Sequence, residues 1–387
     1  MNAGGRVARA LVVWAIGAGV MRLTLWAPEV CPTITRSEAR AAAVDAAEWI
    51  VVNQDDDGRY LYDFHRGRAE SSDDYNLVRH AGVTMSLYQL VRAGELQLLE
   101  PADRGLAWML ERLEPAGAGV AFADTSQAKL GAASLLLVSL AQRRLATSDP
   151  GHDELMQQLG DFIVVQQRPD GSMLELHDLR TGEPVAGKTS VFATGEALWG
   201  LALLHELFPH LGFDEPAWRT LDHLALRRDR DEGIIPPPWP DQWAAYSLGE
   251  MAEWGLEDHH VRYARRVLER FAMISRFDAQ RGTFYGSLTH GPAPRGGGVG
   301  TWLEGMAALR PLVLTDDRLA GLAEPLDQTL ACVAGNLADR QVRPGADTSD
   351  QEAGAWFYDD LTRMDDQQHA ASGLLLAEPV LPTTETP

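Results

Sequence analysis

A threefold internal repeat is the feature of this sequence that most restricts its fold. The chain reads Gln-Asp-Asp-Asp-Gly at residues 54–58, Gln-Arg-Pro-Asp-Gly at 167–171 and Gln-Arg-Gly at 280–282. The glycines that end these turns are 113 and 111 residues apart. A second set of glycines keeps nearly the same spacing: Gly82, Gly195 and Gly305. Self-similarity at a fixed period is typical of folds in which one supersecondary unit packs on the next, so three copies of a double-hairpin unit are predicted.

Apolar residues from position 36 onward recur at i, i+3, i+4 and i+7, which is the period of an α-helix. Proline and glycine clusters, such as those at 236–238 and 296–298, separate the helical segments. Twelve helices, and therefore six hairpins, are predicted, at residues 36–53, 74–93, 101–114, 124–145, 152–167, 190–208, 214–228, 240–255, 257–276, 299–313, 316–340 and 365–378.

The predicted helices alternate between two kinds. Odd-numbered helices carry a charged face, as at 257–276, whereas even-numbered helices such as 190–208 are rich in Ala, Gly and Leu. A helix that is apolar on all sides is buried. Alternating exposed and buried helices would close into an inner ring inside an outer ring, so the predicted fold class is all-α, an (α/α)6 barrel of six hairpins. One domain over residues 35–380 is expected, although a chain of 387 residues could hold two or three.

This arrangement resembles the (α/α)6 toroids of the six-hairpin glycosidase-like superfamily, which holds many glycosidases, uronate lyases and epimerases. The Gln-x-x-Asp-Gly turns are also similar to those of glucuronyl C5-epimerases and terpenoid cyclases. The resemblance covers residues 36–380 as an architecture, and it implies a carbohydrate-active enzyme with a central funnel. The Asp-x-Asp-Asp motif with which class II cyclases protonate their substrates is not found on a predicted inner helix.

Residues 1–34 are predicted to be a signal peptide or signal anchor. Arg6 and Arg9 precede an apolar run from 10 to 21, which is too short to span a bilayer but has the length of a signal-peptide core. The chain is therefore expected to be exported or membrane-anchored in the cell envelope. A cytoplasmic protein with an N-terminal helix packed on its domain is the alternative. Residues 381–387 are expected to be a tail.

The charge and the cysteines argue against several functions. The chain has 34 Lys and Arg against 55 Asp and Glu, and the net charge of −21 argues against a nucleic-acid binder, because phosphate backbones need clustered cations. The two cysteines, Cys31 and Cys332, have no spacing that makes a zinc site, a redox pair or a disulfide framework. No metal and no cofactor are expected, so the chemistry would depend on carboxylates, His, Tyr, Lys or Arg.

The loops that enter the inner helices would line the funnel mouth, where the helix N-termini place partial positive charge. Polar residues at these positions form a collar on otherwise apolar helices. The catalytic candidates are Glu304, Asp241, Glu196, Asp366, His80 and Tyr75. The substrate-binding candidates are Asn76, Arg79, Lys129, Trp239, Trp243, Arg295, Trp302, Trp356 and His369. Structural caps and ion pairs are the alternative interpretation of the charged members.

A glycoside hydrolase is the first functional hypothesis. Glu304 has apolar neighbours in the sequence, and desolvation would raise its pKa toward the range that a general acid needs. Asp241 or Asp366 would be the partner base, because glycoside hydrolysis uses two carboxyl groups on either side of the scissile bond. Tryptophans at the mouth could stack on pyranose rings, so an oligo- or polysaccharide is the expected partner.

Two other functions stay open. Tyr75 and Arg79 are four residues apart on one helix face, as are Asn76 and His80. Tyr75, His80 and Arg79 are residue types with which toroidal uronate lyases neutralise a carboxylate and move a proton, so a uronate lyase or C5-epimerase is the second hypothesis. A non-catalytic glycan-binding or scaffold protein is the third.

Overall fold

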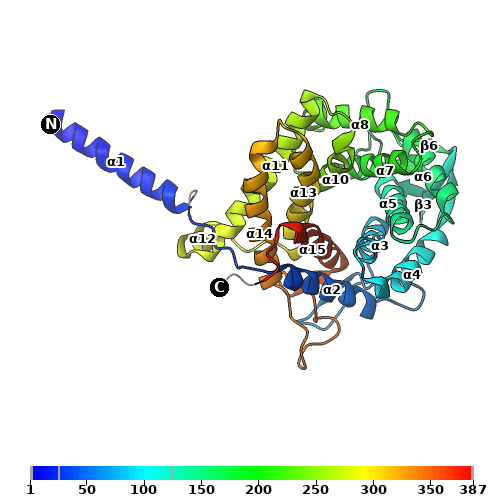
Figure 1. Ribbon diagram of the computed structural model, residues 1–387, viewed down its shortest axis with the longest axis horizontal. Helices are drawn as coiled ribbons and strands as arrows, with labels where there is room; N and C mark the ends of the chain where they lie inside the picture. The colour runs from blue at the N-terminus through cyan, green and yellow to red at the C-terminus, as the bar shows by residue number, and fades with distance from the viewer. Residues whose placement is uncertain (1–2, 25–26, 124, 385–387) are drawn as a thin grey trace.

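The computed structural model describes all residues except 1–2, 25–26, 124 and 385–387, and it confirms the predicted double ring of helices. The inner ring consists of α3 (Leu77–Arg92), α5 (Leu130–Thr147), α7 (Ala193–Leu207), α10 (Gln242–Glu250), α13 (Gly296–Thr315) and α15 (Met364–Ala377). The outer helices are α2 (Arg36–Val52), α4 (Leu99–Leu110), α6 (Asp153–Val165), α8 (Asp214–Leu226), α11 (Asp258–Ala279) and α14 (Ala323–Asp339). Figure 1 shows the ring from one end.

The inner helices close the ring because each packs on the next, and α15 returns to α3. Their composition explains the burial. All residues of α5 from Leu130 to Gln142 are buried, and so are all residues of α7 from Ala193 to Leu204. The outer helices bury one stripe only: α11 buries Val261, Ala264, Val267, Leu268 and Phe271. Burial on all sides in one ring and on one side in the other is what the two kinds of composition predict.

Two of the repeated turns use glycine for the same physical reason. Gly58 and Gly171 have φ angles of 95° and 83°, which side-chain-bearing residues rarely adopt. A Cβ atom at either position would also collide with a backbone carbonyl of the next outer helix, that of Arg104 or Arg219. The third turn, at Gly282, departs from this pattern. It leads into the short helix α12 (Phe284–Thr289), which the sequence analysis did not predict.

Short strands at the ring mouth were also not predicted. β1 (Asp63–His65) pairs with β7 (Leu361–Arg363), β2 (Leu113–Ala116) with β3 (Gly119–Phe122), and β5 (Leu176–Asp178) with β4 (Gln127–Lys129) and β6 (Glu183–Pro184), all antiparallel. The helix predicted at 124–145 was therefore wrong at its start, since residues 127–129 are a strand and α5 begins at Leu130. Cross-strand partners distant in sequence outweigh local helical periodicity here.

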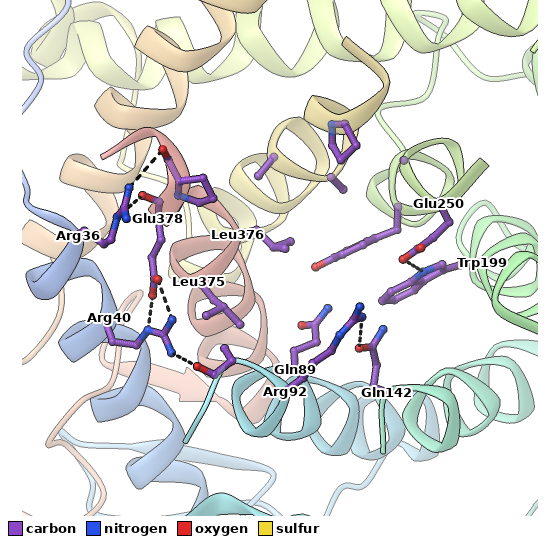
Figure 2. A pocket seen from close by; sticks show the side chains of 17 residues that line it. Arg36, Arg40, Gln89, Arg92, Gln142, Trp199, Glu250, Leu375, Leu376 and Glu378 are labelled. Carbon is purple, nitrogen blue, oxygen red and sulfur yellow. Dashed lines mark hydrogen bonds and ion pairs between the residues drawn. The ribbon is translucent and has the colours of Figure 1, made fainter. Parts of the chain in front are cut away.

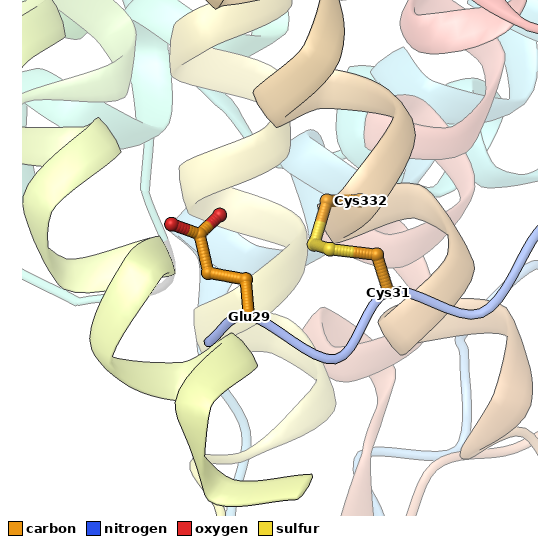
Figure 3. A group of neighbouring side chains, drawn as sticks. All are labelled: Glu29, Cys31 and Cys332. Carbon is orange, nitrogen blue, oxygen red and sulfur yellow. A yellow bond between two sulfur atoms is a disulfide. The ribbon is translucent and has the colours of Figure 1, made fainter. Parts of the chain in front are cut away.

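The expectation that the two cysteines form no disulfide was wrong. Cys31 and Cys332 are bonded, as Figure 3 shows, and the bond ties the segment before α2 to α14. The same segment packs on the ring, because Ala27 and Ile34 are buried and the Val30 amide donates to the Ala279 carbonyl. A bridge between two cysteines 301 residues apart cannot be inferred from their spacing.

The ends of the chain differ in how they pack. The helix α1 (Ala3–Thr24) projects away from the ring (Figure 1). Within the described residues, no helix has both the length and the hydropathy needed to cross a bilayer. At the other end, Leu381 is buried in the core, and residues 385–387 of the expected tail lie outside the described residues.

The disulfide should contribute measurably to stability. Replacing Cys31 by Ser removes a cross-link across 301 residues, and we expect the free energy of unfolding to fall by about 2–5 kcal/mol, because the unfolded chain gains conformational freedom. Urea unfolding of the variant and of the wild type measures this. A reductant should destabilise the wild type and leave the variant unchanged, whereas equal sensitivity of both proteins would contradict the bond.

Candidate functional site

Two cavities lie at opposite ends of the ring axis. One, of about 600 Å³, is lined by the N-terminal ends of all six inner helices, and we call it the front cavity. The other, of about 560 Å³, is lined by the C-terminal ends of the inner helices and by α2, and we call it the rear cavity. The sequence analysis placed the site at the inner-helix N-termini, which corresponds to the front cavity.

Several charged side chains of the rear cavity hold the ends of neighbouring helices. Arg40 forms a bidentate ion pair with Glu378, and Arg36 donates to the Glu378 carbonyl (Figure 2). The Trp199 indole donates to Glu250 at 3.5 Å, and most of the remaining lining is apolar. These contacts stabilise the ends of α2 and α15.

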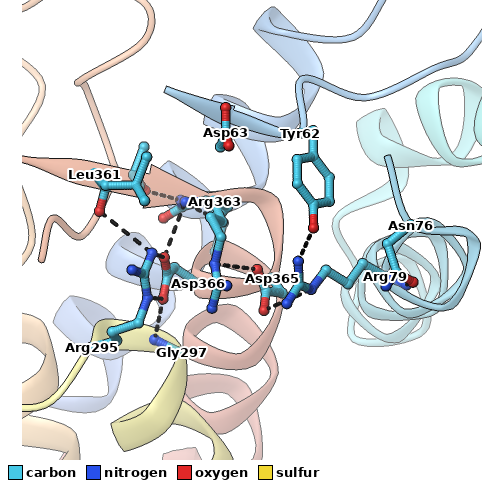
Figure 4. Close-up of polar contacts among 12 residues, drawn as sticks. Tyr62, Asp63, Asn76, Arg79, Arg295, Gly297, Leu361, Arg363, Asp365 and Asp366 are labelled. Carbon is cyan, nitrogen blue, oxygen red and sulfur yellow. Dashed lines mark hydrogen bonds and ion pairs between the residues drawn. The ribbon is translucent and has the colours of Figure 1, made fainter. Parts of the chain in front are cut away.

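A network of ion pairs holds the rim of the front cavity. Asp365 lies between two arginines, with its carboxylate 3.2 Å from Arg79 Nε and 3.3 Å from Arg363 Nε. The Tyr62 hydroxyl accepts a further hydrogen bond from Arg79 (Figure 4). Because these residues come from α3, α15 and the loop before β1, the network fixes the first and last inner helices to each other.

Asp366 is held by a second set of contacts at the same rim. Its carboxylate accepts two hydrogen bonds from Arg295, at 2.5 and 3.2 Å, and one each from the amides of Gly297 and Arg363 (Figure 4). A carboxylate with this many donors is a strongly held structural anion. Asp366 lines the cavity, yet its position favours clamping α13 to α15 over acting as the base predicted for it.

His369 and Glu304 form the one His–carboxylate dyad in the described part of the front cavity wall. His369 Nδ1 lies 2.6 Å from Glu304 Oε2, and His369 lines the cavity while Glu304 is fully buried behind it. The Nδ1 proton therefore donates to Glu304, and Nε2 is the nitrogen left to meet a substrate. Although burial disfavours the imidazolium, the charge of Glu304 and its hydrogen bond raise the pKa of His369.

Further polar groups support Glu304 from behind. The Tyr246 hydroxyl donates to Glu304 Oε1 at 3.2 Å, and Ser372 donates to Gln89 at 2.7 Å beside it. Burial raises the pKa of Glu304, and His369 and Tyr246 partly offset this. Glu304 is thus an orienting group for His369, and it does not line the cavity as the sequence analysis expected of a general acid.

Glu196 is the carboxyl group of the front cavity with the most perturbed acidity. It is 3% exposed, lines the cavity from the first turn of α7, and makes no ion pair with a described residue. Burial, followed by the charges of Asp241 and Glu175, raises its pKa to about 8. A Cβ atom at Gly131 would collide with the Glu196 carboxylate, so the glycine makes room for this group. Glu196 is therefore protonated near neutral pH and can donate a proton.

Two buried amides in the same wall lack hydrogen-bond partners among the described residues. Gln242 Oε1 and Gln368 Nε2 are buried without a partner, and both side chains line the cavity. An unpaired buried amide is costly, so such groups at a cavity wall are expected where a polar ligand supplies the missing hydrogen bonds.

Tyr75 and His80 do not line the front cavity, and their contacts with each other are those of a structural pair. His80 is fully buried, with Nε2 2.9 Å from the Gly105 carbonyl and Nδ1 2.6 Å from the Tyr75 hydroxyl. The carbonyl requires a proton on Nε2, so Tyr75 donates to Nδ1 and also accepts from the Tyr60 amide at 3.1 Å. Burial lowers the pKa of His80 to about 3, which keeps it neutral. The pair fixes α3 against α4.

Asp241 is also structural. It is fully buried, accepts from the amides of Trp243 and Ala244 as the N-cap of α10, and pairs with the buried Arg228 at 2.5 Å. Arg228 lies in α9 (Arg228–Asp231). These contacts hold Asp241 away from the cavity lining, and its charge helps to keep Glu196 protonated.

The tryptophans expected at the mouth differ in where their side chains lie. Trp243 lines the cavity, 5.8 Å from the His369 ring and stacked on Trp199. Trp356, which was expected to bind substrate, is 1% exposed and donates to the Leu337 carbonyl, so it packs as a core residue. Trp239 and Trp302 are half-buried and do not line the cavity.

The structure thus brings part of the predicted collar together. The predicted residues that line the front cavity are Asn76, Arg79, Lys129, Glu196, Trp243, Arg295, Asp366 and His369. Sequence reasoning missed Glu175 and Gln242 as site residues. Gln242 follows the N-cap of α10 and could have been found by its position, whereas Glu175 lies in a loop that gave no signal.

Neither cluster with metal-ligand geometry in the described residues suits a metal. Cys31 and Cys332, beside Glu29, are joined in the disulfide and offer no thiolate. In the group of Asp222, His259 and His260, the Glu257 amide donates to His260 Nδ1, which leaves the proton on Nε2 where a metal would bind. That Nε2 donates to Asp222 instead.

Comparisons with known proteins agree with the fold. Cellobiose 2-epimerase from Spirochaeta thermophila DSM 6192 superposes with a TM-score of 0.61 at 15% identity, covering 89% of this chain and 96% of that one. A D-mannose isomerase gives 0.60 at 11% identity over 88% and 97%. A possible GH105 family member from Salmonella enterica serovar Paratyphi A gives 0.55 at 13% identity over 90% and 94%. No protein-family profile matches the sequence, and no curated protein aligns with it. The chain is an (α/α)6 toroid, as its sequence predicted.

The raised pKa of Glu196 predicts a specific dependence of stability on pH. Its pKa is raised from 4.5 to about 8, so between these values the folded state holds a proton that the unfolded state lacks. The free energy of unfolding should therefore fall as pH rises through this window, and Glu196→Gln should lack this part of the loss, which amounts to a few kcal/mol. Urea unfolding at about pH 5, 7 and 9 measures this loss of stability across the window.

Glu253→Gln is the matched control, because Glu253 is exposed. It should follow the wild type at every pH. If Glu196→Gln also follows the wild type, Glu196 is ionised throughout and cannot act as an acid.

Proposed function

We propose that this chain is a sugar isomerase or epimerase that moves a proton on the carbon next to the carbonyl of an open-chain sugar. The observation that carries the proposal is the pairing of a base and an acid in one cavity. His369, oriented by Glu304, offers Nε2, and Glu196 offers a carboxyl proton. The cavity of about 600 Å³ suits a mono- or disaccharide.

The proposed reaction begins when His369 Nε2 takes the proton from the carbon next to the carbonyl. The electron pair of the broken C–H bond moves toward the carbonyl oxygen, which takes the proton of Glu196, and an enediol results. Return of a proton to the neighbouring carbon, while the other enediol hydroxyl gives its proton to the Glu196 carboxylate, yields the isomer. Delivery of a proton from solvent to the opposite face of the same carbon, while the first hydroxyl returns its proton to Glu196, yields the epimer. A base with a pKa close to the working pH is efficient in such a step, and Glu304 raises the pKa of His369 in that direction.

Substrate binding has its own support in the cavity wall. Gln242 and Gln368 offer a buried acceptor and a buried donor, which are the groups that sugar hydroxyls need. Trp243 lies beside His369, and Lys129 extends from the end of β4. The solved epimerase and isomerase structures with the same fold are consistent with a sugar substrate.

A glycoside hydrolase remains a second candidate because of one further pair. Glu175 and Glu196 both line the front cavity, and the charge of Glu175 contributes to the raised pKa of Glu196. Two carboxyl groups facing one cavity, one of which keeps its proton, are what glycoside hydrolysis requires. In this scheme Glu196 takes the role of the acid that the sequence analysis gave to Glu304.

Exchange of hydrogen with solvent distinguishes the two candidates. In D2O, proton transfer should introduce deuterium at C2 of an aldose such as mannose, glucose or cellobiose and yield an isomer or epimer, visible by NMR. His369→Asn and Glu196→Gln should each lower the exchange rate by about 10²-fold or more, because each removes a group that moves a proton.

Two substitutions of exposed residues are the matched controls. His210→Asn and Glu253→Gln should exchange at the wild-type rate, since both side chains lie outside the cavity. If the wild type releases reducing ends from an oligosaccharide without C2 exchange, and Glu175→Gln abolishes this release, the hydrolase replaces the isomerase proposal. Wild-type exchange in His369→Asn would also contradict the proposal.

A further inference from the structure

The helix α1 exposes apolar side chains on all sides. Figure 1 shows it pointing away from the side of the ring rather than lying on it. Within the described residues, the exposed fraction of its large apolar side chains ranges from 41% to 77%. These residues are Val7, Leu11, Val12, Val13, Trp14, Ile16, Val20, Met21 and Leu23. A soluble helix normally hides such residues, so this helix is expected to have an apolar environment of its own.

A second apolar patch lies beside the base of this helix. The helix α12 packs near α1, and it exposes Phe284, Tyr285 and Leu288 by 73%, 47% and 69%. The two aromatic rings contact edge to face. We call the exposed apolar residues of α1 and α12 the N-terminal apolar surface. Its two parts come from segments more than 250 residues apart in the sequence, so only the tertiary structure joins them.

The charge of this region contrasts with that of the whole chain. The helix α1 contains Arg6, Arg9 and Arg22 and no acidic residue, whereas the chain carries a net charge of −21. A basic helix is complementary to an anionic surface. The acidic protein is therefore repelled least by such a surface at the end of the molecule that carries α1.

We propose that the N-terminal apolar surface binds an anionic lipid bilayer and attaches the toroid to it by one side. As a helix, the uncharged apolar run from 10 to 21 is about 18 Å long, which is shorter than the bilayer hydrocarbon core of about 30 Å. The helix therefore lies in one leaflet along the membrane surface, where Arg6, Arg9 and Arg22, at the two ends of the run, stay among the headgroups. Phe284 and Tyr285 lie where aromatic side chains of membrane proteins gather, at the level of the headgroups.

A lipid surface fits better than a protein groove for a geometric reason. A groove covers one face of a helix, and helices that bind grooves are apolar on that face only. Here the run is apolar all round, as a helix surrounded by lipid would be. Membrane attachment is independent of the proposed sugar chemistry, because the front cavity opens at an end of the ring while α1 projects from its side.

The disulfide ties the segment that follows α1 to the ring and indicates the compartment. Cys31, seven residues after the end of α1, is bonded to Cys332 in α14, so the base of the helix is tied to the ring. Disulfides persist in oxidising compartments, which places the attached face on the outer side of a membrane.

Vesicle sedimentation with the full-length, disulfide-bonded chain tests the proposal. Vesicles of phosphatidylglycerol and phosphatidylcholine in about a 1:3 ratio should pellet the protein, and vesicles of phosphatidylcholine alone should pellet less of it. Phe284→Ser/Leu288→Ser and Ile16→Glu should each weaken the binding by about tenfold or more, because each withdraws apolar surface from the bilayer or places a charge in it.

Leu96→Ser and Leu226→Ser are the matched controls, since both leucines are exposed elsewhere on the toroid, by 69% and 58%. These variants should bind vesicles like the wild type, and all variants should keep the wild-type melting temperature. Three results would overturn the proposal. In the first, the α1 and α12 variants bind vesicles as well as the wild type. In the second, the wild type binds no vesicles and forms a dimer that those variants dissociate. In the third, the chain recovered from expressing cells begins after α1.

Discussion

Close contact between the backbones of the inner helices is the constraint on which the site depends. A Cβ atom at Gly300 would lie 2.5 Å from the backbone carbon of His369, so only glycine lets α13 approach α15 this closely. That approach brings His369 onto Glu304. At Gly131 the same absence of a side chain provides the space for the Glu196 carboxyl group. The small residues of the inner ring thus determine where its few ionisable groups can stand.

Buried charges in this protein fall into two classes, and their partners distinguish them. Asp241 and Asp366 are each paired with an arginine and with backbone amides, so they stabilise helix ends. Glu196 has no cationic partner among the described residues, and burial leaves it protonated. A group whose acidity departs from its ordinary value while it faces a cavity is a candidate for proton transfer.

The predicted helices and their alternation were correct because they depend on local information. The period of apolar residues fixes each helix, and burial on all sides requires an inner ring. The disulfide and the strands that pair across the mouth could not be predicted in the same way. Cys31 with Cys332, and β1 with β7, are partners some 300 residues apart, and nothing in their local sequence records the pairing.

The sequence by itself determined a ring of twelve helices with a polar collar at the N-termini of the inner six. Only the tertiary structure decided which members of that collar face the cavity. Each inner helix can turn about its own axis without changing its period, and partners on other helices fix that rotation. Arg228 in α9 draws Asp241 into the core, and the Gly105 carbonyl does the same to His80. His369 and Glu196 meet no such partner outside the ring, so they remain at the cavity wall.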